Sequence, residues 1–494
     1  MSWIFPLPLA ALALSATPAP AAVDGGTPIP YANQPDLQSA PMGFYETGLA
    51  LADINGDGYP DLITASGNDQ GLQPLAVYLN TRENEFFGKL QRPDWVSADP
   101  DANMNLAVGD INGDGWLDVA VSTLGKPWGS GGVKVYFNQR GTLEKSPSFR
   151  SKDTYNSFAC ALGDANGDGR LDLATSDMYP LAGGSARIYF NQGGTLSPKP
   201  GWRSKPGGLG GGILFTDVQQ DGFLDLVAGT SQVMVFPGSA GADGGISLST
   251  TPGWSSREGD LVPYLSAGPV GTQGTWTLVV SRNNVQGIMS GDAGTPPRYE
   301  AYVPAPDAGQ PVWTSTPINL GSGVKLADVN GDGLTDLLGG SWGGVLPDSG
   351  FFQLYLGQGS TFASQPALTS ARSTQGIIQS LDAADLRQRF TCPGSWSTTL
   401  TRAQAVVTLP LPLVGGISRV SRNGKPVPKR GYTTVPGAPW ISFAQRLAPG
   451  DTLQVTYTHP LSVDVVMANQ DCSLGDFIYS SYANVPGCGT PSKD

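Results

Sequence analysis

One nonapeptide recurs along this chain of 494 residues, and it constrains the fold more than any other feature. It begins at residues 53, 110, 164, 217 and 328, with the pattern D-x-N-x-D-G-x-x-D in all copies except the fourth, which has Gln219 at its third position. The copies are 53 to 57 residues apart, except the last, which follows after 111. A fixed period of this size predicts a propeller or a solenoid.

The double spacing before the last copy predicts a degenerate repeat halfway. Residues 269–277 fill that place: they keep Gly274 at the sixth position and the apolar run that follows, but they contain no carboxylate. We therefore expect six complete units, of which the fifth lacks the acidic loop.

The segments around each nonapeptide predict four short strands per unit. An apolar stretch precedes the nonapeptide, a buried run follows it, and a third alternating segment leads to a fourth that carries Trp95, Trp202, Trp254 or Trp313. Four such strands joined by turns make an antiparallel propeller blade. We expect these tryptophans to pack between neighbouring blades, and we expect helix only around residues 382–390.

A seventh blade is predicted from the two ends of the chain. Residues 376–382 resemble a first strand, the segment from Asp464 resembles a second, residues 476–482 resemble a third, and residues 35–39 match the fourth. Pairing of the termini would leave no open sheet edge. Between Asp382 and Asp464 lie alternating segments and an Asn423-Gly424 turn, which predict a small, Ig-like β-sandwich.

The predicted fold is thus all-β, a seven-bladed β-propeller with a β-sandwich inserted in its last blade. The expected boundaries are 1–22 for a signal peptide, 33–390 for blades one to six and the start of blade seven, 391–461 for the insert, 462–486 for the rest of blade seven, and 487–494 for a tail.

The nonapeptide has the chemistry of a calcium loop. Side-chain oxygens at positions one, three, five and nine, the backbone carbonyl of position seven and a glycine at position six suit a hard cation with oxygen ligands. An EF-hand is excluded, because no glutamate occupies position twelve and the flanking segments are strands. The predicted ligands are Asp53, Asn55, Asp57, Tyr59 and Asp61; Asp110, Asn112, Asp114, Trp116 and Asp118; Asp164, Asn166, Asp168, Arg170 and Asp172; Asp217, Gln219, Asp221, Phe223 and Asp225; and Asp328, Asn330, Asp332, Leu334 and Asp336.

Two questions stay open at this point. Turns stabilised by the aspartates without metal are the alternative, although repeated clustering of carboxylates costs repulsion. Whether the loop at 217–225 binds metal is undecided, because Gln219 is longer than asparagine. We expect four to five structural Ca²⁺ sites.

The nonapeptides and their flanking strands resemble the FG-GAP/VCBS repeat family, which includes the propeller of integrin α-subunits. The resemblance covers about residues 33–390 and 462–486. It implies calcium loops on one face of a seven-bladed propeller and, as in integrins, ligands on the other. The metal-free fifth repeat and the insert depart from the family pattern.

The N-terminus and the cysteines indicate the compartment. Residues 3–14 are apolar and small residues follow up to Ala22, which predicts a secretory signal and an extracellular protein, the periplasm being the alternative. Cys160 lies in an apolar run and is expected to be a buried thiol, and we expect a Cys392–Cys488 disulfide. No other apolar stretch is long enough to span a membrane.

Charge and composition narrow the function. The net charge is −12, which disfavours nucleic-acid binding, and the single histidine, His459, excludes sites that need two. Because no nucleophile or paired-glutamate motif is present, we expect a monomeric adhesion or binding protein, not an enzyme, with an extracellular protein or glycan as ligand. The alternatives are a lectin-like protein and a polysaccharide lyase or hydrolase. The candidate ligand-face aromatics are Trp128, Tyr155, Tyr179 and Trp342, with Phe44 and Tyr45 leading into the first repeat.

Overall fold

The structure is a computed structural model, and the regular elements of its described residues are almost entirely β-strands. Apart from one 3-10 turn at Lys429–Gly431, their regular elements are strands. The helix expected at 382–390 is wrong: β30 (Ile378–Ala384) runs through its first residues, because Leu381 and Ala383 alternate into the core as in a strand. The structure describes residues 29–39, 43–82, 87, 92–178, 185–205, 210–241, 245–284, 295–305, 309–318, 320–342, 351–371, 378–388, 391–460, 463–469 and 476–481.

Six sheets in the described ranges repeat one pattern of four antiparallel strands in chain order, which we number sheets 1 to 6. Sheets 1 to 3 are β2 (Glu46–Ala52), β3 (Asp61–Ser66), β4 (Ala76–Tyr78) and β5 (Trp95–Val96); β6 (Asn103–Gly109), β7 (Asp118–Thr123), β8 (Gly132–Tyr136) and β9 (Phe149–Arg150); and β10 (Ser157–Gly163), β11 (Asp172–Asp177), β12 (Ala186–Tyr189) and β13 (Trp202–Arg203). Sheets 4 to 6 are β14 (Ile213–Thr216), β15 (Asp225–Gly229), β16 (Val233–Phe236) and β19 (Trp254–Ser255); β20 (Leu265–Val270), β21 (Thr275–Arg282), β22 (Arg298–Tyr302) and β23 (Trp313–Thr314); and β24 (Gly321–Ala327), β25 (Asp336–Ser341), β26 (Phe351–Tyr355) and β29 (Leu368–Thr369). Two separate hairpins, β17 (Gly238–Ala240) with β18 (Ile246–Leu248) and β27 (Gly357–Gln358) with β28 (Thr361–Phe362), lie between the third and fourth strands of sheets 4 and 6 in the chain.

The last repeat sheet, sheet 7, joins both ends of the described chain. Its order is β30, β38 (Asp464–Asn469), β39 (Phe477–Tyr479) and β1 (Leu37–Gln38). Leu37 pairs with Ile478 and Gln38 with Phe477, so the pairing predicted for residues 35–39 is confirmed. The N-terminal strand therefore supplies the fourth strand of a sheet whose other strands come from the C-terminal part.

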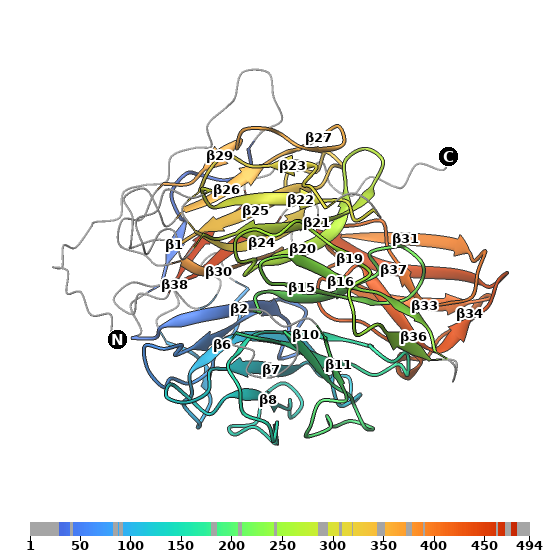
Figure 1. Ribbon diagram of the computed structural model, residues 1–494, viewed down its shortest axis with the longest axis horizontal. Helices are drawn as coiled ribbons and strands as arrows, with labels where there is room; N and C mark the ends of the chain where they lie inside the picture. The colour runs from blue at the N-terminus through green and yellow to red at the C-terminus, as the bar shows by residue number, and fades with distance from the viewer. Residues whose placement is uncertain are drawn as a thin grey trace.

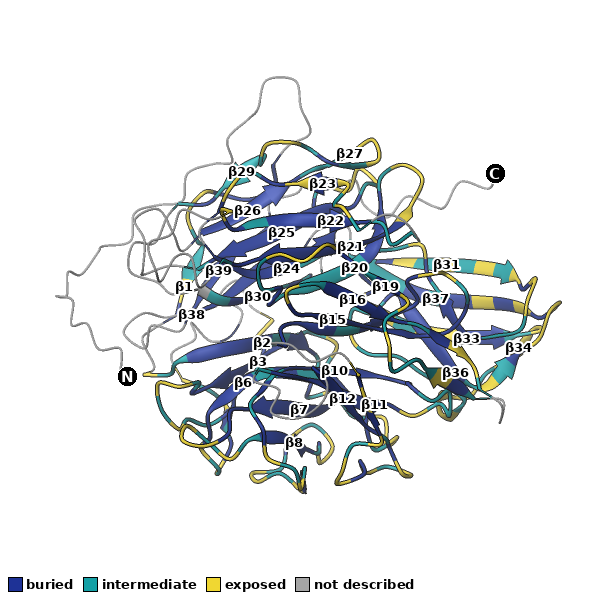
Figure 2. Cartoon of the chain, in the orientation of Figure 1, coloured by how far each residue is buried: buried dark blue, intermediate teal, exposed yellow. Residues whose placement is uncertain are grey.

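The first strands of the seven sheets, which we call the inner strands, contact one another in a closed cycle. β2 lies against β6, and the contacts continue through β10, β14, β20, β24 and β30 back to β2. Figure 1 shows these strands near the centre of the molecule, with β8 and β26 farther out. Figure 2 shows that the inner and second strands are largely buried.

The four repeated tryptophans pack between sheets, as the sequence predicts. Each ring meets an aromatic ring on the third strand of the following sheet in an edge-to-face arrangement, a favoured geometry for aromatic pairs. The centroid distances are 6.1 Å for Trp95–Tyr136, 5.5 Å for Trp202–Phe236, 5.9 Å for Trp254–Tyr302 and 5.1 Å for Trp313–Tyr355.

Residues between β30 and β38 form two further sheets with a hydrophobic cluster of their own. Asn423 and Gly424 both have positive φ, 53° and 73°, as the predicted two-residue turn requires. The sequence missed the first strand, in which the pairing partners of Thr391 to Thr399 lie more than fifty residues away. The strands are β31 (Thr391–Thr399), β37 (Thr452–Pro460), β33 (Gly416–Arg422) and β34 (Lys425–Pro426) in one sheet, and β32 (Gln404–Thr408), β36 (Trp440–Leu447) and β35 (Tyr432–Thr433) in the other.

The cysteines differ in state. Cys160 is a free, buried thiol, and burial raises its pKa to about 12. Cys392 is disulfide-bonded. Its predicted partner, Cys488, lies outside the described residues, as do the predicted signal peptide and tail. In the described part of the chain, no helix has the length and apolar character needed to cross a membrane.

A buried pair of carboxyl groups lies where sheets 1 and 7 meet. Glu46 of β2 and Asp476, next to β39, are each 2 % exposed, and the charge of Asp476 acts on Glu46. The Thr64 hydroxyl of β3 donates to Glu46 at 3.1 Å. Burial, followed by the charges of Glu46 and Asp476, raises the pKa of Tyr78 on β4. Burial, followed by the neighbouring Asp476 charge, holds the pKa of Glu46 well above its usual value.

Glu46→Gln is expected to raise the free energy of unfolding above that of the wild type, and by more at pH 7 than at pH 5. An acid whose pKa is raised by folding stabilises the fold below its unfolded pKa of about 4.3, and that stability falls by about 1.4 kcal/mol per pH unit as pH rises towards the folded pKa. Glutamine has no proton to lose and can still donate to Asp476. Urea midpoints of the wild type and the variant at pH 5, 6 and 7 measure this, with exposed Glu258→Gln as control. A difference between the variant and the wild type that does not grow with pH would contradict the raised pKa of Glu46.

Candidate metal loops and the opposite face

The five acidic nonapeptides occupy one structural position. Each connects an inner strand to the second strand of its sheet, in sheets 1, 2, 3, 4 and 6. Position one directly follows the inner strand and position nine begins the second strand, as Asp53 and Asp61 do in sheet 1. The five loops therefore lie at the same end of the sheets.

The backbone of each loop wraps around its own side-chain oxygens. In the first loop, Asp53 accepts from the backbone N–H groups of Asp57 at 2.9 Å and Gly58 at 2.8 Å, and Asn55 accepts from Asp57 at 3.0 Å. Gly56 and Gly58 have φ of 73° and 92°, the left-handed region that favours glycine. The second, third and sixth sheets repeat these bonds.

The aspartate at position nine is a buried anchor for the sheet. Asp61 accepts from Ile54 N–H and from Asn80 N–H, both at 2.9 Å, and so ties the loop to the end of the third strand. In sheet 7, Asp464 makes the equivalent bonds to Leu386 at 3.1 Å and Ser481 at 2.8 Å, although no nonapeptide precedes it. Position nine therefore has a structural role that does not depend on a metal.

The electrostatics of the loops suit a cation. Burial is the largest cause that raises the pKa of Asp118 to about 7 and of Asp336 to about 8, and the charges of neighbouring aspartates raise both further. Among the described residues, no Lys or Arg forms an ion pair with the loops of sheets 2 and 6. In sheets 1 and 3, Arg82–Asp57 at 3.0 Å and Arg170–Asp168 at 2.5 Å are exposed pairs, which contribute little.

The aspartates alone do not form a finished metal cage. No group of three or more His, Cys, Asp and Glu side chains in the described ranges is gathered closely enough to hold a metal ion by itself. The proposed ligand set is broader, since it includes asparagine and backbone carbonyl oxygens. The donor chemistry fits Ca²⁺, and its binding stays a prediction.

The fourth loop differs from the others. With its amide nitrogen facing the carboxylate, Gln219 donates to both oxygens of Asp225 at 2.8 and 2.9 Å, so this side chain points a donor and not a ligand oxygen at position nine. Arg402, from the segment between β31 and β32, bonds the Gln220 carbonyl, and its charge favours the ionised forms of Asp217 and Asp221. This loop is the weakest metal candidate.

The insert packs directly on the loops of sheets 3 and 4. Ser442 of β36 donates to Asp164, the first position of the third loop, at 2.7 Å. The backbone N–H groups of Ala405 and Val406 donate to the Gly222 carbonyl at 3.0 and 2.9 Å. No sequence pattern predicts these contacts, which join residues more than 180 positions apart.

The degenerate fifth repeat is a tight hairpin. Val270 pairs with Thr275, so four residues replace the acidic loop, and Gly271 and Gly274 have positive φ of 72° and 59°. Sheet 5 instead contains a buried ion pair between Arg282 and Glu300, at 2.9 Å. Neither residue was singled out from the sequence, because no repeat or motif marks them.

The predicted ligand-face aromatics are not equivalent. Trp128, in the loop from β7 to β8, is 37 % exposed. Trp342 is half-buried and donates through Nε1 to Gln379 at 2.7 Å. The prediction that Tyr155 binds a ligand is wrong, because this residue is buried between sheets. Its ring lies under the Arg187 guanidinium at 3.7 Å, and its hydroxyl shares a hydrogen bond with Thr175. Phe44 and Tyr45 are partly buried, and Tyr179 lies outside the described residues.

Comparisons with known proteins also find repeats in the part of the chain that contains the first three acidic loops. The family model described as FG-GAP-like repeat matches residues 48–121 and 124–175, so FG-GAP repeats, as predicted from the nonapeptides, are confirmed there. The phosphatidylinositol-glycan-specific phospholipase D of Rattus norvegicus is 33 % identical over 168 residues, covering 28 % of this chain and 19 % of the rat protein. The Mus musculus protein of the same name is 34 % identical over 166 residues, covering 27 % of this chain and 18 % of its own length. The chain thus spans about a fifth of the length of these curated relatives.

Proposed function

We propose that this protein is a secreted, calcium-stabilised binding or adhesion protein, built as a seven-bladed β-propeller with a β-sandwich module at residues 391–461. Its ligand is an extracellular protein or glycan. Seven four-stranded sheets, a closed cycle of inner strands and the completion of sheet 7 by β1 support the propeller.

One observation supports a ligand site apart from the proposed calcium loops: the acidic loop and Trp128 lie at opposite ends of sheet 2. In sheet 2 the acidic loop 110–118 lies between the first and second strands, whereas Trp128 lies between the second and third strands. Successive connections of an antiparallel sheet lie at opposite ends. The acidic loops thus lie on one face and the exposed Trp128 lies on the other, which supports a ligand site on the face opposite the proposed calcium loops.

The enzyme alternatives are less well supported. The matched relatives are named as phospholipases D, but the match covers under a fifth of their length. One histidine limits acid-base and metal chemistry, and that residue, His459, lies on β37 with its pKa lowered by burial.

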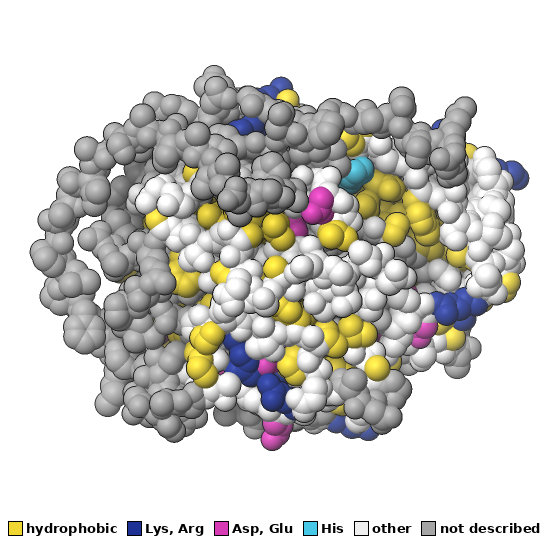
Figure 3. Space-filling view, turned by 90° about the horizontal axis from the view of Figure 1, so that it is seen from above, with side chains coloured by type: hydrophobic (Ala, Val, Ile, Leu, Met, Phe, Trp, Pro, Cys, Tyr) yellow, Lys and Arg dark blue, Asp and Glu magenta, His cyan; other side chains and the backbone are white. Residues whose placement is uncertain are grey.

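A nucleic-acid ligand is also less well supported. Figure 3 shows one face of the molecule on which charged side chains are sparse among hydrophobic and neutral ones, unlike a nucleic-acid-binding surface.

Arrays of immobilised extracellular proteins and glycans, probed with the mature chain at millimolar Ca²⁺, test the proposal. Trp128→Ala is expected to weaken the binding of a positive ligand by about 2 kcal/mol, roughly thirtyfold, as loss of an aromatic hot spot does. Val312→Ala is the matched control. Val312 is 49 % exposed and lies between the third and fourth strands of sheet 5, at the end of the sheet where sheets 1 to 4 and 6 carry their acidic loops. Equal effects of the two variants would contradict the assigned face, and product release from a polysaccharide would favour the enzyme alternative.

A further inference from the structure

A cavity lies on the axis of the ring, among the inner strands. It has a volume of about 370 Å³ and is lined by residues from all seven inner strands or the segments that lead into them. This volume falls within the range of about 300–1,000 Å³ typical of small-molecule sites. Several of the lining residues of these strands are small, among them Ala50, Ala107, Ala161, Gly212 and Gly323.

Residues between β30 and β38 line the end of this cavity nearest the acidic loops. Pro412 and residues 435–440 form part of its wall. A methyl group placed on Gly109 at the end of β6 would lie 3.3 Å from Val435, and one on Gly268 of β20 would lie 3.4 Å from Pro412. The insert therefore fits closely over the strand ends, and it supplies apolar atoms there.

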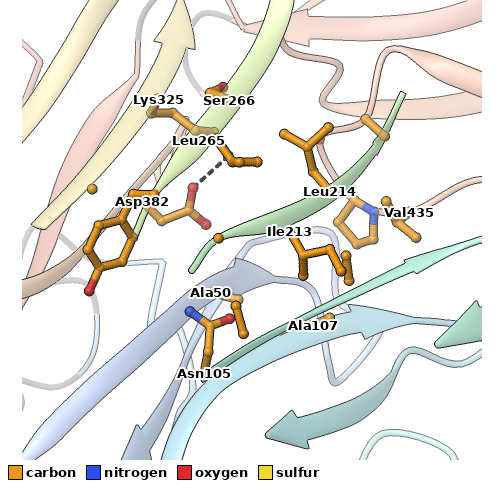
Figure 4. A pocket seen from close by; sticks show the side chains of 18 of the residues that line it. Ala50, Asn105, Ala107, Ile213, Leu214, Leu265, Ser266, Lys325, Asp382 and Val435 are labelled. Carbon is orange, nitrogen blue, oxygen red and sulfur yellow. Dashed lines mark ion pairs between the residues drawn. The ribbon is translucent and has the colours of Figure 1, made fainter. Parts of the chain in front are cut away.

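One ion pair stands in the wall. Lys325 of β24 contacts Asp382 of β30 at 2.6 Å, and these are the only charged residues that line the described cavity. Asp382 also accepts from the backbone N–H groups of Leu51 at 3.1 Å and Ala383 at 2.9 Å. Figure 4 shows the pair on the opposite side of the cavity from Ile213, Leu214 and Val435.

Hydrogen-bonding capacity remains at this wall. The ammonium group of Lys325 has three donors, and within the described residues it forms a single ion pair. The side-chain amide of Asn105 and the hydroxyl of Ser266 form no hydrogen bond in the described part of the chain, and both line the cavity. The cavity thus combines apolar side chains with polar groups of side chains and backbone, and a few convergent polar groups are usual in a small-molecule site.

The charge balance selects the kind of ligand. Lys325 and Asp382 neutralise each other, so a ligand with a net charge would lose part of its hydration in the cavity without meeting an unpaired counter-charge. A neutral oxygen can accept from Lys325 without that penalty. We propose that the axial cavity binds a small, mostly apolar, uncharged molecule whose carbonyl or hydroxyl oxygen accepts a hydrogen bond from Lys325.

Titration calorimetry of the full chain with octanamide, octanoate and octylammonium tests this proposal. Saturable 1:1 binding is expected for octanamide, with both charged probes at least about tenfold weaker. Ala107→Leu fills the cavity and should weaken octanamide binding at least about tenfold, whereas Ala107→Ser keeps the volume and should leave it within about twofold. The melting temperature of each variant establishes that it is folded.

A second variant isolates the hydrogen bond. Lys325→Met is combined with Asp382→Asn, so that no unpaired carboxylate remains, and should weaken octanamide binding about tenfold. No saturable octanamide binding up to its solubility limit would overturn the proposal and indicate a cavity filled by water. Binding that is equal for all three probes, or unaffected by Ala107→Leu, would also overturn it.

Discussion

Removal of calcium by EDTA is expected to lower the free energy of unfolding of this protein by roughly 2–6 kcal/mol. At extracellular affinities of about 10⁻⁴–10⁻³ M, about 1 mM Ca²⁺ contributes roughly 0.4–1.4 kcal/mol per site. Four loops, at 53–61, 110–118, 164–172 and 328–336, keep the full pattern of side-chain oxygens. Their sum is comparable with the net stability of a domain, about 5–15 kcal/mol. Urea denaturation with 1 mM Ca²⁺, with 1 mM Mg²⁺ and with EDTA measures the effect.

A loop variant links the effect to the predicted sites. Asp114, at position five of the second loop, is exposed, so Asp114→Ala should leave the stability in EDTA nearly unchanged. In calcium the same variant should lose the contribution of one site. Gln273→Ala, in the exposed turn of the metal-free fifth repeat, is the matched control. Identical urea midpoints of the wild type in calcium and in EDTA would leave the loops as turns held by their aspartates alone.

Arg282→Met is expected to lower the free energy of unfolding by about 3–5 kcal/mol, as loss of one partner from a buried ion pair does. Arg282 is 1 % exposed, and Glu300, on the next strand, is fully buried. Arg282 also donates to the carbonyls of Ser231 at 2.8 Å and Asp260 at 3.0 Å, which lie in sheet 4 and in the connection to sheet 5. Burial alone would raise the pKa of Glu300, but the Tyr302 hydroxyl and the Arg282 guanidinium outweigh it and hold the pKa below its usual value.

An exposed ion pair provides the comparison. Arg150, with 44 % of its side chain exposed, pairs with Asp99 at 2.6 Å, and Arg150→Met is expected to cost less than about 1 kcal/mol. Replacing both Arg282 and Glu300, by Met and Gln, should recover part of the loss, because Glu300 is then no longer a buried carboxylate that has lost its most buried partner. Its other ion-pair partners, Arg298 at 2.6 Å and Arg257 at 3.2 Å, remain in both variants. Urea denaturation of the wild type, the two single variants and the double variant measures these differences in the free energy of unfolding. A cost for Arg282→Met no larger than that for Arg150→Met would contradict this role.

The features predicted correctly from the sequence depend on neighbours along the chain or on the repeat itself. The loop at 53–61 is recognisable because the hydrogen bonds of Asp53 reach residues four and five positions away. Trp95 could be placed between sheets because a tryptophan recurs at the same point in four repeats. The pairing of residues 35–39 with sheet 7 followed from counting, since that sheet lacked a fourth strand.

The errors and omissions concern contacts that no local pattern encodes. Tyr155 sits in a connecting loop, where an aromatic residue suggests a ligand, but Arg187 and Thr175 of sheet 3 cover it. The helix expected at 382–390 is wrong at its start, because residues 382–384 pair with β38, about eighty residues further on. The contacts of the insert with Asp164 and Gly222 were not foreseen for the same reason.

The sequence by itself determined the all-β repeat, the position of the acidic loops and the strand that completes sheet 7, because strand alternation, glycine turns and oxygen spacing are local properties. Only the tertiary structure decided how Arg282 is paired, which loops the insert covers and how the axial cavity is built around Lys325 and Asp382. These features arise where inner strands or loops from different repeats meet. Their energies depend on burial and charge compensation between residues distant in sequence, which periodicity along one chain does not specify.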